Sequence, residues 1–491
     1  MTTASDDDEY LAEIVRKSSV GIAAFTAERM LLAAVAYITT TVLGAAAYGF
    51  LSVFTRGEII SRNIVAGLGD GYTRIVPRAS ASARRTVLSV GTVGFITVWA
   101  VIAIAIVVLR GPLIDATLLR PRHEGVVVLF AISLLPFLLL RNIRDMFRAL
   151  RRIRVAMLVS RIFTPLTLLA GVMFAVFIGG QSLFGIWLGV AAAALAATVA
   201  GSILLTYGTD LQIGSFRSHR SVVQDFLRYS VDATGVAVLE LVQRRAVFVV
   251  MALYLSPVAA GAFSLSIIVG LVVRWPLSGI NGILPPIAAA LYSDGETQTL
   301  QQLYQQTSRL ATVVTTPVFA LAYVYAPDIL TVFNDAYAQQ SAVLRLVLTG
   351  QYAATVFGSV GLLLLMTDNE RASLRVQVLN AGISLPLMIV LTTRFGPHGL
   401  GAAYLVSLLL NNTTELVLLY VRDGFVPFSH EQAYTAVLAL PLIAGITVTK
   451  SVAGSTTTAL VVVVVVGSYV WFGRRFLLRS ADRNAVRALL E

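Results

Sequence analysis

Apolar runs of about 20 residues recur along almost the whole sequence, with only short polar segments between them. An α-helix needs about 20 such residues to cross the hydrocarbon core of a bilayer. Hydrophobic residues make up 57% of the 491 residues and charged residues only 13%, which excludes an assembly of ordinary soluble domains. We therefore predict an all-α polytopic membrane protein.

The apolar runs predict fourteen membrane-spanning helices, an even number that places both termini on the same side of the membrane. The expected spans cover residues 19–41, 46–68, 86–109, 124–141, 156–178, 183–207, 229–254, 260–284, 308–327, 341–366, 375–394, 400–421, 434–450 and 457–473.

The arginines between these spans predict the orientation of the chain. They concentrate in alternate connections, most densely over residues 141–161, 217–228 and 474–487. Cytoplasmic connections carry such an excess of basic residues. We expect both termini on the cytoplasmic side of the cytoplasmic (plasma) membrane. We also expect the longest connections, Arg141–Arg154 and Gly208–Arg228, to form amphipathic helices along the inner surface.

Several function classes are excluded by the residues that are absent or by where charges lie. There is no cysteine, so disulfides and thiolate metal sites are ruled out. The net charge is +11, but the arginines that produce it lie in the short connections between apolar runs, as expected for a membrane protein. We therefore expect no nucleic-acid partner. No nucleophile elbow or phosphate loop occurs, and Gly67–Gly71 is interpreted as a closely packed turn. We expect no enzyme activity, no cofactor and no metal.

The first two spans carry five ionisable residues near their middles, namely Glu28, Arg29, Arg56, Glu58 and Arg62. A charge at mid-bilayer depth costs about 2.5–3.5 kcal/mol on insertion scales. Glu58 and Arg62 stand at i and i+4 and can pair within one helix. Three arginines still face two acids, which indicates a cavity for an anionic ligand.

An internal repeat relates the two halves of the chain. The link Leu43–Phe50 between spans one and two resembles Leu255–Phe263 between spans seven and eight, 212 residues later, and the same offset places Arg62 on Arg274. We predict an N-lobe at residues 1–215, a C-lobe at 216–428, and a C-terminal helix pair with a cytoplasmic tail at 429–491. Parallel halves of this kind hold substrate between them.

The charged helices of both halves supply the candidate site residues. Arginine suits phosphate because its planar fork binds two oxygens at once and keeps its charge when desolvated. The expected substrate-binding residues are Arg29, Arg56, Arg62, Arg244, Arg245 and Arg274. The expected residues for ion coupling or charge balance are Glu28, Glu58, Asp232 and Glu240.

Four stretches resemble the multidrug/oligosaccharidyl-lipid/polysaccharide (MOP) flippase superfamily, and within it the polysaccharide-flippase branch. They are Leu43–Phe50, Gly67–Arg74, Asn334–Tyr337 and Gly396–Ala403, the last being the most specific. The chain departs from the family pattern at Ala45-Ala46 and at Asn334.

The resemblance implies two six-helix lobes around a central cavity, plus two extra helices, and export of a lipid-linked glycan by alternating access. Arg29, Arg56 and Arg274 match, in helix and depth, the cavity arginines of flippases for lipid-linked peptidoglycan precursors. We expect a monomer that contacts membrane lipids and a polyprenyl-(pyro)phosphate-linked oligosaccharide, with glycosyltransferases of the same pathway as candidate partners.

Two other functions stay open at this point. One is a cation-coupled multidrug antiporter of the same fold, whose cavity should be acidic and aromatic. The other is a membrane glycan polymerase or ligase, which would need a sizeable outer loop with catalytic residues.

Overall fold

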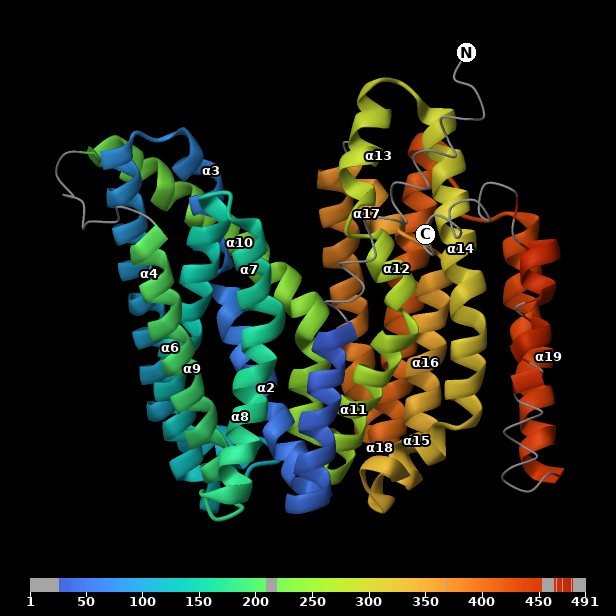
Figure 1. Ribbon diagram of the computed structural model, residues 1–491, viewed down its shortest axis with the longest axis horizontal. Coiled ribbons are helices and arrows are strands. Elements are labelled where there is room, and N and C mark those ends of the chain that lie inside the picture. The colour runs from blue at the N-terminus through green and yellow to red at the C-terminus, as the bar shows by residue number, and fades with distance from the viewer. Residues whose placement is uncertain are drawn as a thin grey trace. The chain divides into compact units, whose positions relative to one another are not determined.

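The computed structural model describes residues 26–208, 219–367, 369–452, 463–464, 466–469, 471–477 and 479. Every regular element in these residues is a helix (Figure 1). The predicted all-α class is therefore confirmed.

The chain divides into two compact units. One comprises Met30–Gly261 and the other Ala262–Glu491 together with Met1–Arg29. The long helix α10 (Arg220–Tyr254) packs on α2, α3 and α4, and so belongs to the first unit. The lobe boundary predicted between residues 215 and 216 comes from the internal sequence repeat, whereas the two compact units are defined by their internal contacts. The lobe boundary therefore stays a prediction.

The unit Met30–Gly261 contains helices coloured from blue to green in Figure 1. After the helical residues 30–38, its elements are η1 (Thr39–Leu43), α2 (Ala45–Ile64), α3 (Ala66–Ile75), η2 (Val76–Arg78), α4 (Ala81–Val108), α5 (Arg110–Ala116), η3 (Pro121–His123), α6 (Glu124–Ala149), α7 (Ile153–Leu158), η4 (Val159–Phe163), α8 (Thr164–Phe177), α9 (Leu183–Gly208) and α10.

Glycines of α3 allow this helix to pack very closely on α10. A Cβ atom at Gly67 would lie 2.3 Å from the carbonyl oxygen of Ser230, and one at Gly71 would lie 2.8 Å from the Phe226 ring. Small residues four apart let two membrane helices approach in this way. The predicted turn at Gly67–Gly71 is wrong, since these residues are helical, but the close packing is confirmed.

The expected surface helix Arg141–Arg154 is also corrected. Helix α6 continues through Arg141 to Ala149 without a break, and the chain turns only at Leu150–Arg152. Polar side chains do not end a helix by themselves, so the last turns of α6 carry the arginines.

The unit that begins at Ala262 carries the remaining elements, coloured from yellow-green to red. They are the greater part of α11 (Pro257–Val273), then α12 (Trp275–Ile280), α13 (Leu284–Ser293), α14 (Thr297–Val324), α15 (Ala326–Phe333), η6 (Asp335–Gln340), α16 (Ser341–Val356), α17 (Val360–Met366), α18 (Glu370–Asp423), α19 (His430–Val452) and η7 (Gly473–Leu477).

The segment α18 is two antiparallel helices that meet at Gly396. This residue has φ 57° and ψ −136°, a combination that only glycine adopts readily. Asn380 Nδ2 donates to Asn411 Oδ1 over 3.2 Å, and Arg422 Nη1 donates to Asn369 Oδ1 over 2.8 Å. Both pairs are centred on the same point beside Gly396, as a hairpin requires. The two arms correspond to the expected spans 375–394 and 400–421.

The connection from α18 to α19 is tied to α14. The Gln301 amide donates to the carbonyl oxygen of Val426 at 2.8 Å and accepts from its backbone N–H at 3.0 Å. Buried Leu442 and Ile446 of α19 then pack with Val313 and Ala320 of α14. Helix α19 is therefore part of this unit's core on one face.

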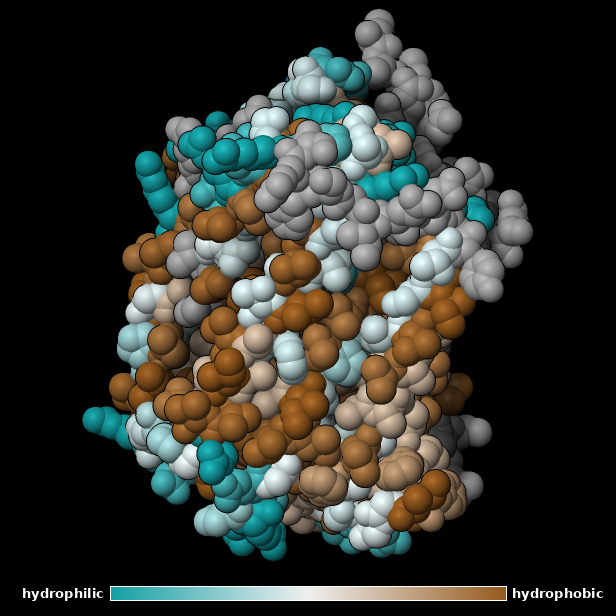
Figure 2. Space-filling model, turned by 90° about the vertical axis from the view of Figure 1, so that its left-hand side faces the viewer, coloured by the Kyte–Doolittle hydropathy of each residue, from teal (hydrophilic) through white to brown (hydrophobic). Residues whose placement is uncertain are grey.

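Seven helices of the described residues, with the hairpin α18 counted once, are long and apolar enough to cross a membrane, or eight if the bent pair Asp335–Val356 and Val360–Met366 forms one span. Expected spans two and eight are interrupted, the second at Val65 and the eighth at Arg274. On the face shown in Figure 2, apolar residues form a broad band between two ends where hydrophilic residues gather.

Candidate functional site

The first part of the candidate site joins α2 to α10 through an aromatic ring. The guanidinium carbon of Arg56 lies 4.1 Å from the centre of the Phe248 ring, and that of Arg245 lies 6.0 Å from it. Phe248 is buried, whereas both arginines keep partial exposure. A ring face attracts a cation and supports it where water is scarce. Two of the six predicted substrate-binding arginines thus lie near the same aromatic ring.

The second part lies further along α2. Arg62 Nη2 donates to Glu58 Oε2 over 3.0 Å, and Arg62 Nε makes a second close contact with the same carboxylate. Glu58 is 4% exposed, so its charge depends on this partner. The predicted pairing of these two residues is confirmed. Arg141 of α6 contacts α2 beside this pair, since its Nη1 donates over 3.3 Å to Oδ1 of Asn63, the residue that follows Arg62.

Asp145 of α6 is the second buried acid of this region. Arg144 Nε and Nη2 donate to its Oδ1 over 2.9 and 2.5 Å. Arg141 Nε lies 3.4 Å from its Oδ2 without hydrogen-bond geometry. Helix α3 passes over this carboxylate because residue 69 is glycine. Three arginines therefore surround two carboxylates, and one positive charge is left over.

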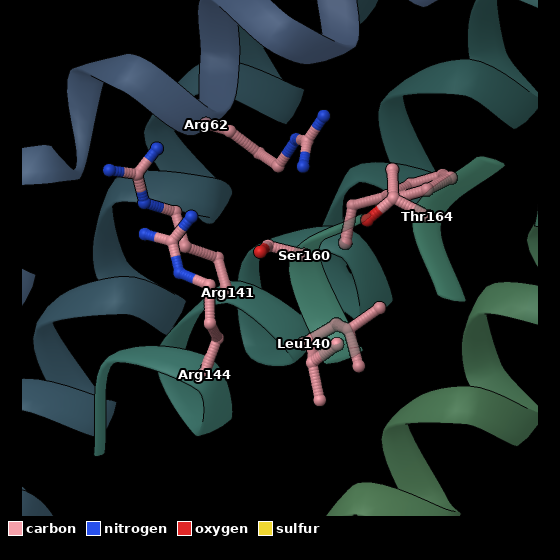
Figure 3. Close-up of a pocket in the computed structure, with 8 residues that line it drawn as sticks. Arg62, Leu140, Arg141, Arg144, Ser160 and Thr164 are labelled. Carbon is pink, nitrogen blue, oxygen red and sulfur yellow. The ribbon is translucent and has the colours of Figure 1, made fainter. Parts of the chain in front are cut away.

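These arginines line a small cavity between α6 and the start of α8. Figure 3 shows side chains from α2 and α6 at this cavity, with the Ser160 hydroxyl facing them. Its volume is only about 10 Å³, enough for one water molecule. The lining residues are Arg62, Phe137, Leu140, Arg141, Arg144, Val159, Ser160 and Thr164.

A wider, open hollow of about 300 Å³ adjoins the cavity and shares Arg144 and Ser160 with it. Arg148 stands at this hollow, and its Nη1 lies 3.7 Å from Asp70 Oδ1. Partial burial raises the pKa of the Asp70 carboxyl above its usual value, although Arg148 opposes the shift. A protonated Asp70 would no longer offset Arg148, so the hollow is most positive at low pH.

The other predicted site residues have surroundings of their own. Arg29 Nη2 lies 3.8 Å from Glu28 Oε1, and both side chains are largely buried. Arg274 stands at the break between α11 and α12 and is partly exposed. Asp232 is exposed on α10. The side chains of Glu240 and Arg244 lie outside the described part of the structure.

Sequence reasoning missed Arg144 and Asp145 as site residues because it placed them in a surface segment. A signal was present in the spacing. Arg141, Arg144, Asp145 and Arg148 stand at i, i+3, i+4 and i+7, the pattern of one helix face.

Comparison with known proteins gives the family. A family model described as "Polysaccharide biosynthesis protein" matches residues 79–341, which is more than half of the chain. The chain belongs to the polysaccharide biosynthesis protein family. A search of curated protein sequences gives no match.

Solved structures show the fold of this polysaccharide biosynthesis protein. The lipid II flippase MurJ in an inward closed conformation has a TM-score of 0.75 at 11% identity, over 94% of this chain and all of that one. An inward-facing multidrug resistance MATE transporter of the MOP superfamily has a TM-score of 0.65 at 14% identity, over 81% and 94%. A MOP superfamily transporter from Pyrococcus furiosus has a TM-score of 0.56 at 15% identity, over 84% and 96%.

The family match agrees with the polysaccharide branch that the sequence predicts, and the solved structures show the fold of the predicted superfamily. The polysaccharide biosynthesis protein is a multi-pass membrane protein with the MOP transporter fold, and the relatives named above are transporters rather than enzymes.

Proposed function

We propose that the chain is a flippase that moves a polyprenyl-(pyro)phosphate-linked oligosaccharide across the cytoplasmic membrane by alternating access. The glycan would serve surface polysaccharide or glycoprotein biosynthesis. The observation that carries the proposal is the pair Arg56 and Arg245, two cations from different helices on one buried ring. A (pyro)phosphate is the part of a lipid-linked glycan that needs such cations inside a membrane.

The charge balance of the described residues supports an anionic rather than a cationic substrate. The buried acids Glu58 and Asp145 are both engaged by arginines, and the nearby arginines outnumber them. A cation-coupled multidrug antiporter remains the alternative, because MATE transporters share the fold. A glycan polymerase or ligase is the further alternative, and the fold shared with a flippase and a transporter supports transport over it.

Surface-glycan export in a strain that lacks the gene tests the proposal. Alanine at Arg29, Arg56 or Arg274 should each abolish export while membrane-inserted protein stays at wild-type level in an immunoblot. Lysine should restore export only in part, because it cannot reproduce the two-oxygen fork of arginine. Wild-type glycan levels with alanine at all three positions would overturn the cationic-site mechanism.

A dye-efflux assay separates the alternative function. If the chain exports cationic drugs, cells that express it should lose ethidium faster than cells with an empty vector, and alanine at Arg56 should not slow that loss. We expect no difference from the empty vector.

The proposed setting follows from the arginine distribution and the family. Both termini would lie in the cytoplasm, and the protein would act as a monomer. The glycosyltransferases that assemble the lipid-linked oligosaccharide are its proposed partners, since they supply the substrate on the cytoplasmic side.

A further inference from the structure

We propose that the hollow at the end of α6 is a second anion site, which holds the phosphate headgroup of an anionic membrane phospholipid. This site is separate from Arg56 and Arg245, and it does not depend on what the protein transports. Its cations are Arg144 and Arg148, with Arg141 and Arg62 behind them at the adjoining cavity.

The first step of the argument is charge. The four arginines Arg62, Arg141, Arg144 and Arg148 face three acids, Glu58, Asp145 and Asp70, so the described cluster has one surplus cation. Surplus charge in a partly buried place attracts a counter-ion strongly because water screens it little.

The second step is hydrogen-bond capacity. Arg144 gives Nε and one terminal nitrogen to Asp145, and its other terminal nitrogen stays available for a ligand. Arg148 has no contact with Asp70 shorter than 3.7 Å, beyond hydrogen-bond reach, and its side chain is 55% exposed. Arg144 and Arg148 are one helical turn apart on α6, a spacing that lets both side chains reach the oxygens of one phosphate.

The third step is size. The inner cavity of about 10 Å³ admits water but no phosphate, whereas the open hollow of about 300 Å³ admits a headgroup. Figure 3 shows the side chains of Arg62, Arg141, Arg144 and Ser160 at the inner cavity. Arg144 and Ser160 also line the hollow.

The fourth step is the apolar wall beside the cations, which indicates a lipid rather than a soluble anion. The hollow is also lined by Ala156 and Met157, and Met157 is 42% exposed. Leu158 and Leu166 continue an exposed apolar surface, at 44% and 38%. The chain between them winds as a π-helical turn over Val159–Phe163, a form often found at functional sites. An acyl chain would lie on this surface while the phosphate meets the arginines.

Native mass spectrometry of the purified full-length protein tests the site with phosphatidylglycerol as the probe. The variant R144A/R148A should bind this lipid about 30-fold more weakly, at about 1 kcal/mol for each basic residue. The control R78A/R154A removes two exposed arginines outside the hollow and should bind within about twofold of wild type. Equal binding by wild type and R144A/R148A, or equal loss in the control, would overturn the proposal.

Exposed positions keep the test valid if R144A disturbs folding. Arg148→Glu and Met157→Asp change only exposed side chains at the hollow, and each should weaken phosphatidylglycerol binding at least about fivefold by placing a negative charge there. Wild-type binding by both variants would contradict the site.

Two further arms identify the ligand. Phosphatidylcholine should bind at least about tenfold more weakly than phosphatidylglycerol, and millimolar inorganic phosphate should not displace the lipid. Displacement by inorganic phosphate would show a soluble-anion site and overturn the lipid assignment. Arg56→Ala should bind phosphatidylglycerol like wild type, so loss of transport and loss of this site are measured independently.

Discussion

Gly69 of α3 lies directly over the carboxylate of Asp145 in α6, where an added Cβ atom would come within 2.2 Å of Oδ2. The same carboxylate holds Arg144 and faces Arg141. A methyl group at position 69 would therefore displace the acid from its arginines or push α3 away from α6.

Gly69→Ala should lower the thermal unfolding midpoint in detergent, with a loss of about 2–3 kcal/mol from overpacking beside a buried charge. Gly235→Ala is the matched control, because Gly235 is also helical and has no atom within 4 Å of its added Cβ. We expect the control to be as stable as wild type or slightly more so. Equal midpoints for all three proteins would contradict the contact.

Arg62→Ala should lower the stability of the protein more than removal of both charges of its ion pair. Removal of Arg62 leaves the buried Glu58 carboxylate without its main partner, which costs about 3–5 kcal/mol for a fully buried pair and somewhat less here, since Arg62 is 19% exposed. The double variant E58Q/R62A should regain part of that stability. Fluorescence-detected size-exclusion chromatography after heating measures all three proteins. A double variant less stable than R62A would argue against a paired role.

Phe248→Leu should reduce glycan export even though the position stays apolar and buried. Loss of the ring removes about 0.5–2 kcal/mol of support for the Arg56 guanidinium. Arg56→Ala should then cost less in the F248L background than in wild type, since the two changes remove one interaction. Phe319→Leu is the control, because it also removes a packed aromatic ring but leaves Arg56 and Phe248 unchanged. The Phe319 ring stacks on Tyr352, with the ring centroids 4.3 Å apart. Additive effects at positions 56 and 248 would refute the coupling.

The topology prediction can be tested with single cysteines, since the chain has none of its own. Cysteine at Arg154 should react with an impermeant maleimide only in inverted membrane vesicles, and cysteine at Gln181 only in intact cells or spheroplasts. Both positions are exposed, and α8 lies between them. Labelling of both from the same side would be incompatible with the fourteen-span arrangement.

The sequence predicted best what depends on neighbours along one helix. Glu58 and Arg62 are one turn apart, so their pairing follows from helical geometry alone. The turn at Gly396 was also foreseeable, because a glycine before a proline separates two apolar runs.

Contacts between distant segments could not be foreseen in the same way. Hydropathy falls at Arg141 and so marks the edge of an apolar run, yet α6 continues because its polar residues still favour a helix. That Asp145 lies under Gly69 depends on how α3 crosses α6, which no local pattern encodes. The helix breaks also depend on such contacts. They fall at Val65 in one half and at Arg274 in the other. An offset of 212 residues pairs Arg274 with Arg62, so the predicted match is three residues away from the match of the two breaks.

The hairpin of α18 constrains how this part of the chain can change in length during evolution. Its cross-links join residues at equal distances from the turn, so a residue inserted into one arm would rotate every later partner by about 100°. Asn411 and Arg422 would then both miss their partners, although neither had been altered. Length changes in homologues should therefore be rare between residues 369 and 422, or should occur as matched pairs on either side of Gly396.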